Sequence, residues 1–187
     1  MIAKLASANP HKLAELRSAL PGWRLELLDA HEFPEEEAET YLGNARAKAR
    51  FGRTVADRTA WILGEDSGLE VAGLGGMPGV HSNRWAGEGE DHVVKLLDAL
   101  RGVEGAGRRA RYVCELVCLS PAGEERRATG TLEGAIATER RGSEGFGYDP
   151  VFVPDGETRT VAELGNAWKS RHSHRARAAG DLLSALA

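Results

Sequence analysis

Two acidic residues follow a short apolar run near the middle of the chain. Glu65 and Asp66 come directly after an expected strand over residues 59–63, and glycines are frequent from there to Gly89. A connection of this length is usually functional or disordered, and the apolar residues spread through it argue against disorder. Carboxylates at the end of a buried strand, beside glycines that permit close backbone approach, indicate a metal site or a proton-transfer site.

A second acidic group precedes an expected helix over residues 40–56. Glutamates fill most of residues 35–39, and such a run is usually a solvated face. Because the positive end of the helix dipole follows, one of these glutamates can turn inward as a second metal ligand. Glu36 and Asp66, each with its neighbours, are therefore the two carboxylate groups of interest.

Basic residues stand at two expected helix starts, where the helix dipole disfavours cations. Lys12 lies in the first turn of a helix over residues 10–20, after Asn9 as cap and Pro10, and the exposed N–H groups there form a candidate phosphate site. Taken alone, that stretch fits an ordinary capped helix with a surface lysine better. The segment from Lys169 to Arg175 is expected to open the C-terminal helix, and its cations either meet an anionic partner or serve solubility.

A second glycine-rich segment, residues 142–150, precedes a short apolar strand at residues 151–153. Because it leads into a strand rather than from a strand into a helix, it is neither a P-loop nor a dinucleotide-binding loop. Aromatic residues between glycines can stack on a nucleotide base while the backbone approaches it closely. The alternative is a tight loop that packs Phe146 and Tyr148 into the core.

The composition is that of an ordinary globular protein of 187 residues with a net charge of −4 at pH 7, and we expect a single domain over residues 1–187. No apolar run reaches the roughly twenty residues of a membrane span, and the apolar stretch at the N-terminus is too short for a signal-peptide core, so the expected location is cytoplasmic, with no membrane partner. The acidic balance disfavours binding to a nucleic-acid polymer. Cys114 and Cys118 are about 13 Å apart on one face of an expected strand and are expected to be core residues.

The remaining elements are expected to position these groups. Strands are expected over residues 1–7 and 23–28, a helix over residues 91–101, and a hairpin of two long strands over residues 109–119 and 125–137. Carboxylates for a divalent ion, together with cations for phosphates, describe a nucleotide-processing site. No Walker-type loop is present, which excludes the P-loop NTPases.

Five separated motifs resemble the inosine triphosphate pyrophosphatase family, also called XTP/dITP diphosphatases. They are S-A-N-P-H-K at 7–12, N-A-x-x-K-A at 44–49, D-S-G-L-E-V-x-x-L-G-G-x-P-G-V at 66–80, G-F-G-Y-D-P-V-F at 145–152, and A-E-L followed by K and S-H-R within 162–175. The match covers almost the whole chain, in order and at compatible spacing.

The resemblance implies an α/β fold with a long mixed central sheet flanked by helices, in two lobes with a substrate cleft between them. It also implies Mg2+-dependent hydrolysis of ITP, dITP and XTP to the nucleoside monophosphate and pyrophosphate, which removes non-canonical purine nucleotides from the pool. The implied partners are the purine nucleoside triphosphate and a second copy of the chain in a homodimer.

By the same resemblance, Asp66 is the general base and, with Glu36, a ligand of Mg2+. The implied substrate contacts fall in groups along the chain. The triphosphate would be held by Ser7, Ala8, Asn9, Pro10, His11 and Lys12, and Ser67 would touch the substrate beside Asp66. The base or sugar would meet Phe146, Gly147, Tyr148 and Asp149, Lys169 would reach the phosphate or the base, and His174 and Arg175 would read the six-position oxygen of the purine. An arginine donor there favours a keto base over adenine.

Three residues depart from the commoner family pattern. Glu65 stands in place of an aspartate, Gly43 in place of a glutamate and His11 in place of a glycine. Glu65 keeps the charge but lengthens the side chain, which alters any second metal contact. Two alternatives remain: a pyrophosphatase for modified pyrimidine nucleotides, which the S-H-R and G-F-G-Y-D motifs disfavour, and a nucleotide-binding regulator without turnover, which the presence of both Glu36 and Asp66 disfavours.

Overall fold

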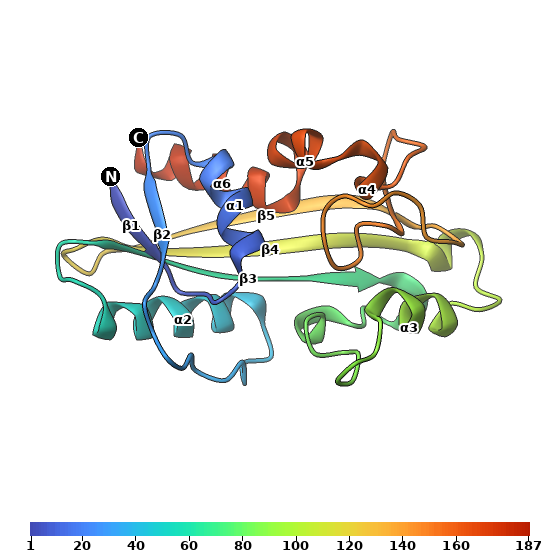
Figure 1. The fold of residues 1–187 in the computed structure, drawn as a ribbon, viewed down its shortest axis with the longest axis horizontal. Coiled ribbons are helices and arrows are strands. Elements are labelled where there is room, and N and C mark those ends of the chain that lie inside the picture. Colours follow the sequence, from blue (N-terminus) through green and yellow to red (C-terminus); the bar gives the residue numbers. More distant parts are fainter. The chain divides into compact units, whose positions relative to one another are not determined.

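The computed structural model describes residues 1–187, which form a six-stranded sheet and α-helices (Figure 1). The strands are β1 (Ile2–Leu5), β2 (Arg24–Leu27), β3 (Trp61–Val71), β4 (Arg109–Leu119), β5 (Glu125–Ile136) and β6 (Phe152–Pro154). The helices are α1 (Pro10–Ala19), α2 (Tyr41–Val55), α3 (His92–Ala99), α4 (Val161–Leu164), α5 (Asn166–His172) and α6 (His174–Leu186). None of these helices combines the length and the apolar character that a membrane crossing requires.

The sheet is mixed and has the strand order β2-β1-β3-β4-β5-β6. Strand β1 pairs in parallel with β2 and with β3, where Leu5 lies beside Leu63. Strand β6 pairs antiparallel with β5. Strands β4 and β5 are sheet neighbours joined by a tight turn, in which the N–H of Gly123 donates to the Ser120 carbonyl at 2.9 Å. The predicted α/β fold with a mixed central sheet is confirmed.

The chain forms two compact units. The first comprises Met1–Ser67, Cys114–Gly130 and His174–Ala187, and the second comprises Gly68–Val113 and Thr131–Ser173. Strands β3, β4 and β5 therefore contribute residues to both units. The single domain over residues 1–187 and the substrate cleft between two lobes stay predictions.

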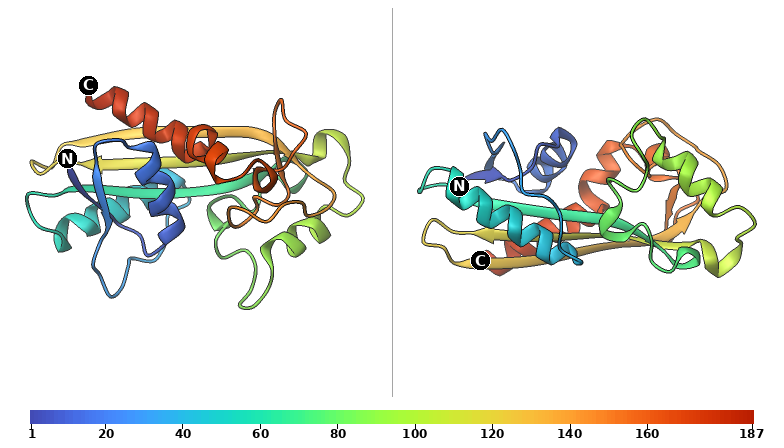
Figure 2. Two further views of the ribbon diagram at one scale, coloured as in Figure 1. Left: turned by 45° about the horizontal axis from the view of Figure 1, so that its top comes forward. Right: turned by 90° about the horizontal axis from the view of Figure 1, so that it is seen from below.

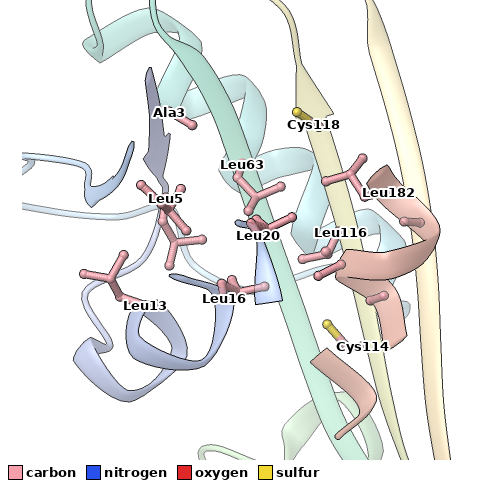
Figure 3. Close-up of a cluster of buried hydrophobic side chains, with 14 residues drawn as sticks. Ala3, Leu5, Leu13, Leu16, Leu20, Leu63, Cys114, Leu116, Cys118 and Leu182 are labelled. Carbon is pink, nitrogen blue, oxygen red and sulfur yellow. The ribbon is translucent and has the colours of Figure 1, made fainter. Parts of the chain in front are cut away.

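In the first unit, α1 and α6 cover one face of the sheet and α2 covers the other (Figure 1 and Figure 2). Apolar side chains fill the space beneath α1 and α6, among them Leu5, Leu16 and Leu182 (Figure 3). Cys114 and Cys118 are free and buried in this cluster, so their predicted place in the core is confirmed. A smaller apolar cluster joins α2 to β3 and β4.

The second unit has an apolar core of its own. Leu96 of α3 and Leu100, which follows the last residue of that helix, pack there with Leu69 of β3. Phe152 of β6 is fully buried in the same cluster, and its ring centre lies 4.6 Å from that of Tyr112 in β4. This core holds the end of β3 that follows the two acids.

Strand β3 corrects the predicted position of the two acids. The sequence predicts a strand over residues 59–63 followed by a loop, whereas the strand runs from Trp61 to Val71 and contains both carboxylates. The strand tolerates these charges because cations from the helices bind each of them. Gly64 allows α2 to lie directly on the strand, since a Cβ there would stand 2.0 Å from the Ala45 carbonyl oxygen.

The basic segment near the C-terminus does not open a single helix, contrary to the prediction. Lys169 lies in the last turn of α5, Arg175 lies in the first turn of α6, and Ser173 between them is extended with φ −64° and ψ 161°. A cation in the last turn of a helix lies near the negative end of the dipole, where it is favoured. The dipole argument for an external anion therefore does not apply to Lys169.

Gly64→Ala is expected to destabilise the protein by about 3 kcal/mol, because the new Cβ would overlap backbone atoms of α2. Gly180→Ala in α6 is the matched control. A Cβ there meets nothing within 4 Å, so its helix propensity is expected to stabilise the protein by about 1 kcal/mol. Urea denaturation measures both changes, and a Gly64→Ala variant as stable as the parent would contradict the close contact.

Candidate functional site

Asp66 in β3 is held from the α2 side of the sheet by two side chains one helical turn apart. Its Oδ1 lies 2.9 Å from the Lys48 ammonium, and its Oδ2 accepts a hydrogen bond of 3.1 Å from the amide of Asn44. Both partners come from α2, where positions four residues apart share a face. Asp66 is only 3% exposed, so the chain rather than the solvent orients its carboxylate.

The Lys48 ammonium also binds Glu36, the second acid that the sequence singles out. Nζ forms a short ion pair with Glu36 Oε1, and it donates to the carbonyl oxygen of Glu65 at 3.1 Å. Glu36 lies in the segment between β2 and α2. The structure therefore brings the two predicted metal ligands, Glu36 and Asp66, to the same cation.

Burial and charge shift the pKa values of this group. Burial raises the pKa of Asp66; Lys48 opposes this and the carboxylates of Glu36 and Glu65 reinforce it, so the net shift is upward. Burial lowers the pKa of Lys48, but the same three carboxylates outweigh burial and raise it. Asp66 is therefore a better proton acceptor than an exposed aspartate.

Glu65 points to the opposite face of the sheet, because neighbouring residues of a strand alternate. Its Oε2 lies 2.6 Å from Nζ of Lys12 in α1, and its Oε1 accepts from Nε of Arg175 in α6 at 3.0 Å. The side chain is fully buried. Burial raises the pKa of Glu65, but the charges of Lys12 and Arg175 outweigh burial and hold the pKa well below its usual range.

Arg175 is surrounded by groups of its own chain. Besides Glu65, its guanidinium donates to Ser67 Oγ at 2.7 Å and lies 3.4 Å from a carboxylate oxygen of Glu15. Arg175 and its neighbour His174 are both buried. Arg175 thus links Ser67, another predicted substrate contact, to the ion pairs on this face, and its anionic partners are carboxylates of the protein.

The turn at residues 7–12 is built around the cap of α1. Asn9 Oδ1 accepts from the N–H groups of His11 at 2.9 Å and Lys12 at 3.3 Å, and Ser7 Oγ accepts from the Asn9 N–H at 3.1 Å. This cap satisfies N–H groups at the start of α1, as expected for an ordinary capped helix, and phosphate binding at this turn stays a prediction. The exposed members of the turn are Ala8, Pro10 and His11.

In the second unit, Asp149 organises the glycine-rich and aromatic loop. Its Oδ2 accepts from the Lys169 ammonium at 2.6 Å and from the Phe146 N–H at 2.8 Å, and its Oδ1 accepts from the Tyr112 hydroxyl at 3.3 Å. The ammonium of Lys169 lies 3.9 Å from the centre of the Phe146 ring, which adds a cation–π contact. The structure therefore brings three predicted substrate contacts together in this unit.

Two further residues of this loop have structural roles. Tyr148 is buried in the core and donates its hydroxyl to the Ser82 carbonyl at 3.0 Å. Gly147 has φ +60°, a conformation that side chains disfavour. Core packing, the alternative that the sequence left open for this loop, therefore describes Tyr148, whereas Phe146 is half-buried.

The model of the Ham1 family matches residues 3–185 of the chain. The chain belongs to the Ham1 family. Similar proteins include the dITP/XTP pyrophosphatase of Bdellovibrio bacteriovorus, which is 41% identical over 195 residues with 97% of this chain and 96% of that protein covered. The dITP/XTP pyrophosphatase of Thermus thermophilus is 43% identical over 188 residues, with 97% of this chain and 89% of that protein covered.

Solved structures of similar proteins share the fold of this Ham1 family member. A HAM1 protein from Coxiella burnetii superposes with a TM-score of 0.85 at 33% identity, covering 100% of this chain and 98% of that one. The nucleoside-triphosphatase, or dITP/XTP pyrophosphatase, from Mycobacterium abscessus gives a TM-score of 0.73 at 40% identity, with the same coverage. The family that the five motifs indicate is confirmed.

The donor set on the α2 side of this Ham1 fold fits a hard divalent cation. Glu36 and Asp66 both bind one cation already, the ammonium of Lys48. Carboxylate oxygens suit Mg2+, which proteins usually hold with one or two carboxylates while substrate phosphates and water complete the shell. No cluster of three or more His, Cys, Asp or Glu side chains able to hold a metal ion is present.

Several residues that contact the predicted site residues were not assigned a role in the sequence analysis. Asn44 and Lys48 stand in the motif at 44–49, and their spacing of four on a helix is a signal that they share a face. Glu15 follows Lys12 by three residues on α1, which is the same kind of signal. Tyr112 stands in the middle of a strand, and its contact with Asp149 has no local signal.

Glu65→Gln is expected to lower the free energy of unfolding by about 3 kcal/mol at neutral pH, because it leaves Lys12 and buried Arg175 without their shared carboxylate. Since the folded-state pKa of Glu65 is lowered, this stabilisation is complete above the ordinary glutamate pKa of about 4.3 and is lost as the pH falls below it. The difference between parent and variant is therefore expected to stay constant from neutral pH to about 5.5 and to shrink below about 4.

Urea denaturation at each pH measures this difference. Glu26→Gln is the control, because the ion pair of Glu26 with Lys4 is partly exposed to solvent and its loss is expected to change stability much less. A difference for Glu65→Gln that grows on acidification would contradict the assigned ion pairs.

Proposed function

We propose that this Ham1 family member hydrolyses the non-canonical purine nucleoside triphosphates dITP, ITP and XTP to the nucleoside monophosphate and pyrophosphate. The proposal includes Mg2+ as the metal, a homodimer as the assembly, and the cytoplasm as the location. The names of the relatives from Bdellovibrio bacteriovorus and Thermus thermophilus support the substrate class. Hydrolysis of the bond between the α- and β-phosphates requires a group that takes a proton from water and groups that compensate the charge of the triphosphate.

The observation that carries the proposal is the buried carboxylate of Asp66, held beside a second acid. Its raised pKa suits the removal of a proton from the attacking water. The ammonium of Lys48 pairs with both Asp66 and Glu36. This pairing supports the proposal that the two carboxylates together bind a cation. When bound there, Mg2+ would neutralise phosphate charge and orient the triphosphate. Asp66 accepts a proton from water as the water oxygen attacks the α-phosphorus; the bond from that phosphorus to the oxygen that bridges to the β-phosphate breaks, and pyrophosphate leaves.

Within this proposal, the other predicted residues contact the phosphates, the sugar or the base of the substrate. The Lys12 ammonium carries three N–H donors and gives one to Glu65, so its remaining donors serve a phosphate. The half-buried ring of Phe146 meets the base or the sugar, and the ammonium of Lys169 beside it reaches the phosphate or the base. His174 and Arg175 read the six-position oxygen.

Product analysis on the purified protein tests the function. ITP, dITP, XTP, GTP, ATP and a pyrimidine triphosphate are each incubated with Mg2+, and pyrophosphate is resolved from orthophosphate. The expected result is pyrophosphate from ITP, dITP and XTP, with ATP turned over much more slowly. Orthophosphate as the product, no product at all, or equal rates on ATP and ITP would each exclude the proposal.

Asp66→Asn is expected to lower kcat for ITP by a factor of about 10² to 10⁴, because it removes the proton acceptor while keeping the shape of the side chain. The matched control is Asp98→Asn, whose carboxylate forms an exposed pair with Arg101 and is expected to leave kcat unchanged. Steady-state kinetics at saturating Mg2+ measures both variants. Near-full turnover of Asp66→Asn would show that another group accepts the proton.

Arg175→Lys is expected to lower the ratio of kcat/KM for ITP over ATP by about tenfold or more. Lysine keeps a cation for Glu65 but loses the fixed fork of N–H donors that suits a keto oxygen and disfavours an amino group. Arg177→Lys, at an exposed position of the same helix, is the control. An unchanged ratio would count against a base-reading role for Arg175.

A further inference from the structure

Asn44 is a buried amide whose two ends are bound to different parts of the candidate site. It lies in the first turns of α2 and is only 2% exposed. Its Nδ2 donates to Asp66 Oδ2 at 3.1 Å, and its Oδ1 accepts from the backbone N–H of Ala38 at 3.0 Å. One side chain therefore joins strand β3 to the segment that precedes α2.

The contact with Asp66 leaves that carboxylate little rotational freedom. Lys48 binds Oδ1 at 2.9 Å and Asn44 binds Oδ2, so each oxygen has its own partner on α2. The backbone of α2 is in turn fixed against β3, since a Cβ at Gly64 would stand 2.0 Å from the Ala45 carbonyl oxygen. A packed backbone and two side-chain partners thus define one plane for the carboxylate of Asp66.

The contact with Ala38 holds the segment that carries Glu36. This segment connects β2 to α2 and contains no helix or strand of its own. Ala38 stands two residues after Glu36, and farther back the ring of Phe33 packs against Phe51 of α2 at 5.8 Å between ring centres. Asn44 ties the backbone of this segment to the helix two residues after Glu36.

Helix capping does not account for this residue. Thr40 already caps α2, because its Oγ1 accepts from the Gly43 N–H at 3.1 Å. A buried amide in the first turns of a helix offers no advantage in helix propensity. Its side chain, by contrast, donates a hydrogen bond to Asp66 and accepts one from the backbone two residues after Glu36.

We propose that Asn44 is a positioning residue for the hydrolysis proposed above: it fixes the orientation of Asp66 and, through Ala38, the position of Glu36. The inference rests on the proposed function for its kinetic consequence. Groups that orient the ligands of a metal or the base of a reaction typically affect affinity or rate by about 10- to 100-fold when removed. A small displacement of the reacting groups has a comparable effect.

Three variants separate positioning from general loosening of the helix. Asn44→Asp keeps an acceptor for Ala38 but replaces the donor to Asp66 with a second carboxylate. Asn44→Ala removes both contacts. Thr40→Ala removes the neighbouring cap and is the matched control, because it weakens the start of α2 without touching either acid. Circular dichroism and thermal unfolding establish that each variant is folded.

The kinetic test compares kcat and KM for ITP in the parent, Asn44→Asp and Thr40→Ala. We expect kcat of Asn44→Asp to fall by about 10- to 100-fold with KM for ITP within about threefold of the parent, whereas Thr40→Ala keeps kcat within about twofold. A kcat of Asn44→Asp within twofold of the parent overturns the proposal. Equal losses in Asn44→Asp and Thr40→Ala overturn it as well, because they indicate only a weakened helix.

The second test needs no substrate. Binding of Mn2+ alone is followed by the electron paramagnetic resonance signal of the free ion, and Asp66→Asn identifies the binding that belongs to this site. We expect Asn44→Ala to weaken this binding by about tenfold and Thr40→Ala to leave it within twofold. Equal affinity in Asn44→Ala and the parent overturns the role of Asn44. A parent that binds Mn2+ in this way but releases no pyrophosphate would exclude the proposed function alone.

Discussion

Two neighbouring carboxylates buried in one strand set the constraint on which the rest of the first unit depends. Each buried charge costs several kcal/mol unless a partner compensates it. Because successive strand residues point to opposite faces, Glu65 and Asp66 need cations on both faces of the sheet. Lys12 of α1 and Arg175 of α6 serve Glu65, and Lys48 of α2 serves Asp66. Three helices are thus fixed to the strand by charge as well as by apolar packing.

The same alternation gives the two acids different chemistry. Two cations bind Glu65, which keeps it charged and makes it an anchor for side chains from both ends of the chain. Asp66 shares one ammonium with Glu36, and its pKa is raised. One strand therefore presents a permanent anion on one face and a proton acceptor on the other. The Glu65 side chain meets Lys12 through one carboxylate oxygen and Arg175 through the other.

Short sequence patterns predicted most helices and strands correctly. They did not predict the ion pairs between residues that are far apart in the sequence. Asn9 and Thr40 cap their helices as the sequence indicates, and the apolar strand residues correctly place Cys114 in the core. Strand β3 was predicted too short because two adjacent acids look like the end of a strand, while the cations that compensate them lie far away in the sequence. The basic C-terminal segment was misassigned for a different reason: Ser173 interrupts it with an extended conformation that composition does not reveal.

The protonation order of the two acids is the most direct test. Carbon-13 NMR of selectively labelled Asp66 and Glu65 carboxylates, followed from neutral pH downward, reports each proton uptake separately. The opposite-face arrangement predicts that Asp66 takes up its proton first, with its pKa raised from the ordinary aspartate value, and that Glu65 stays charged below the ordinary glutamate pKa. Protonation of Glu65 before Asp66, or at the ordinary glutamate pKa, would contradict the division into anchor and proton acceptor.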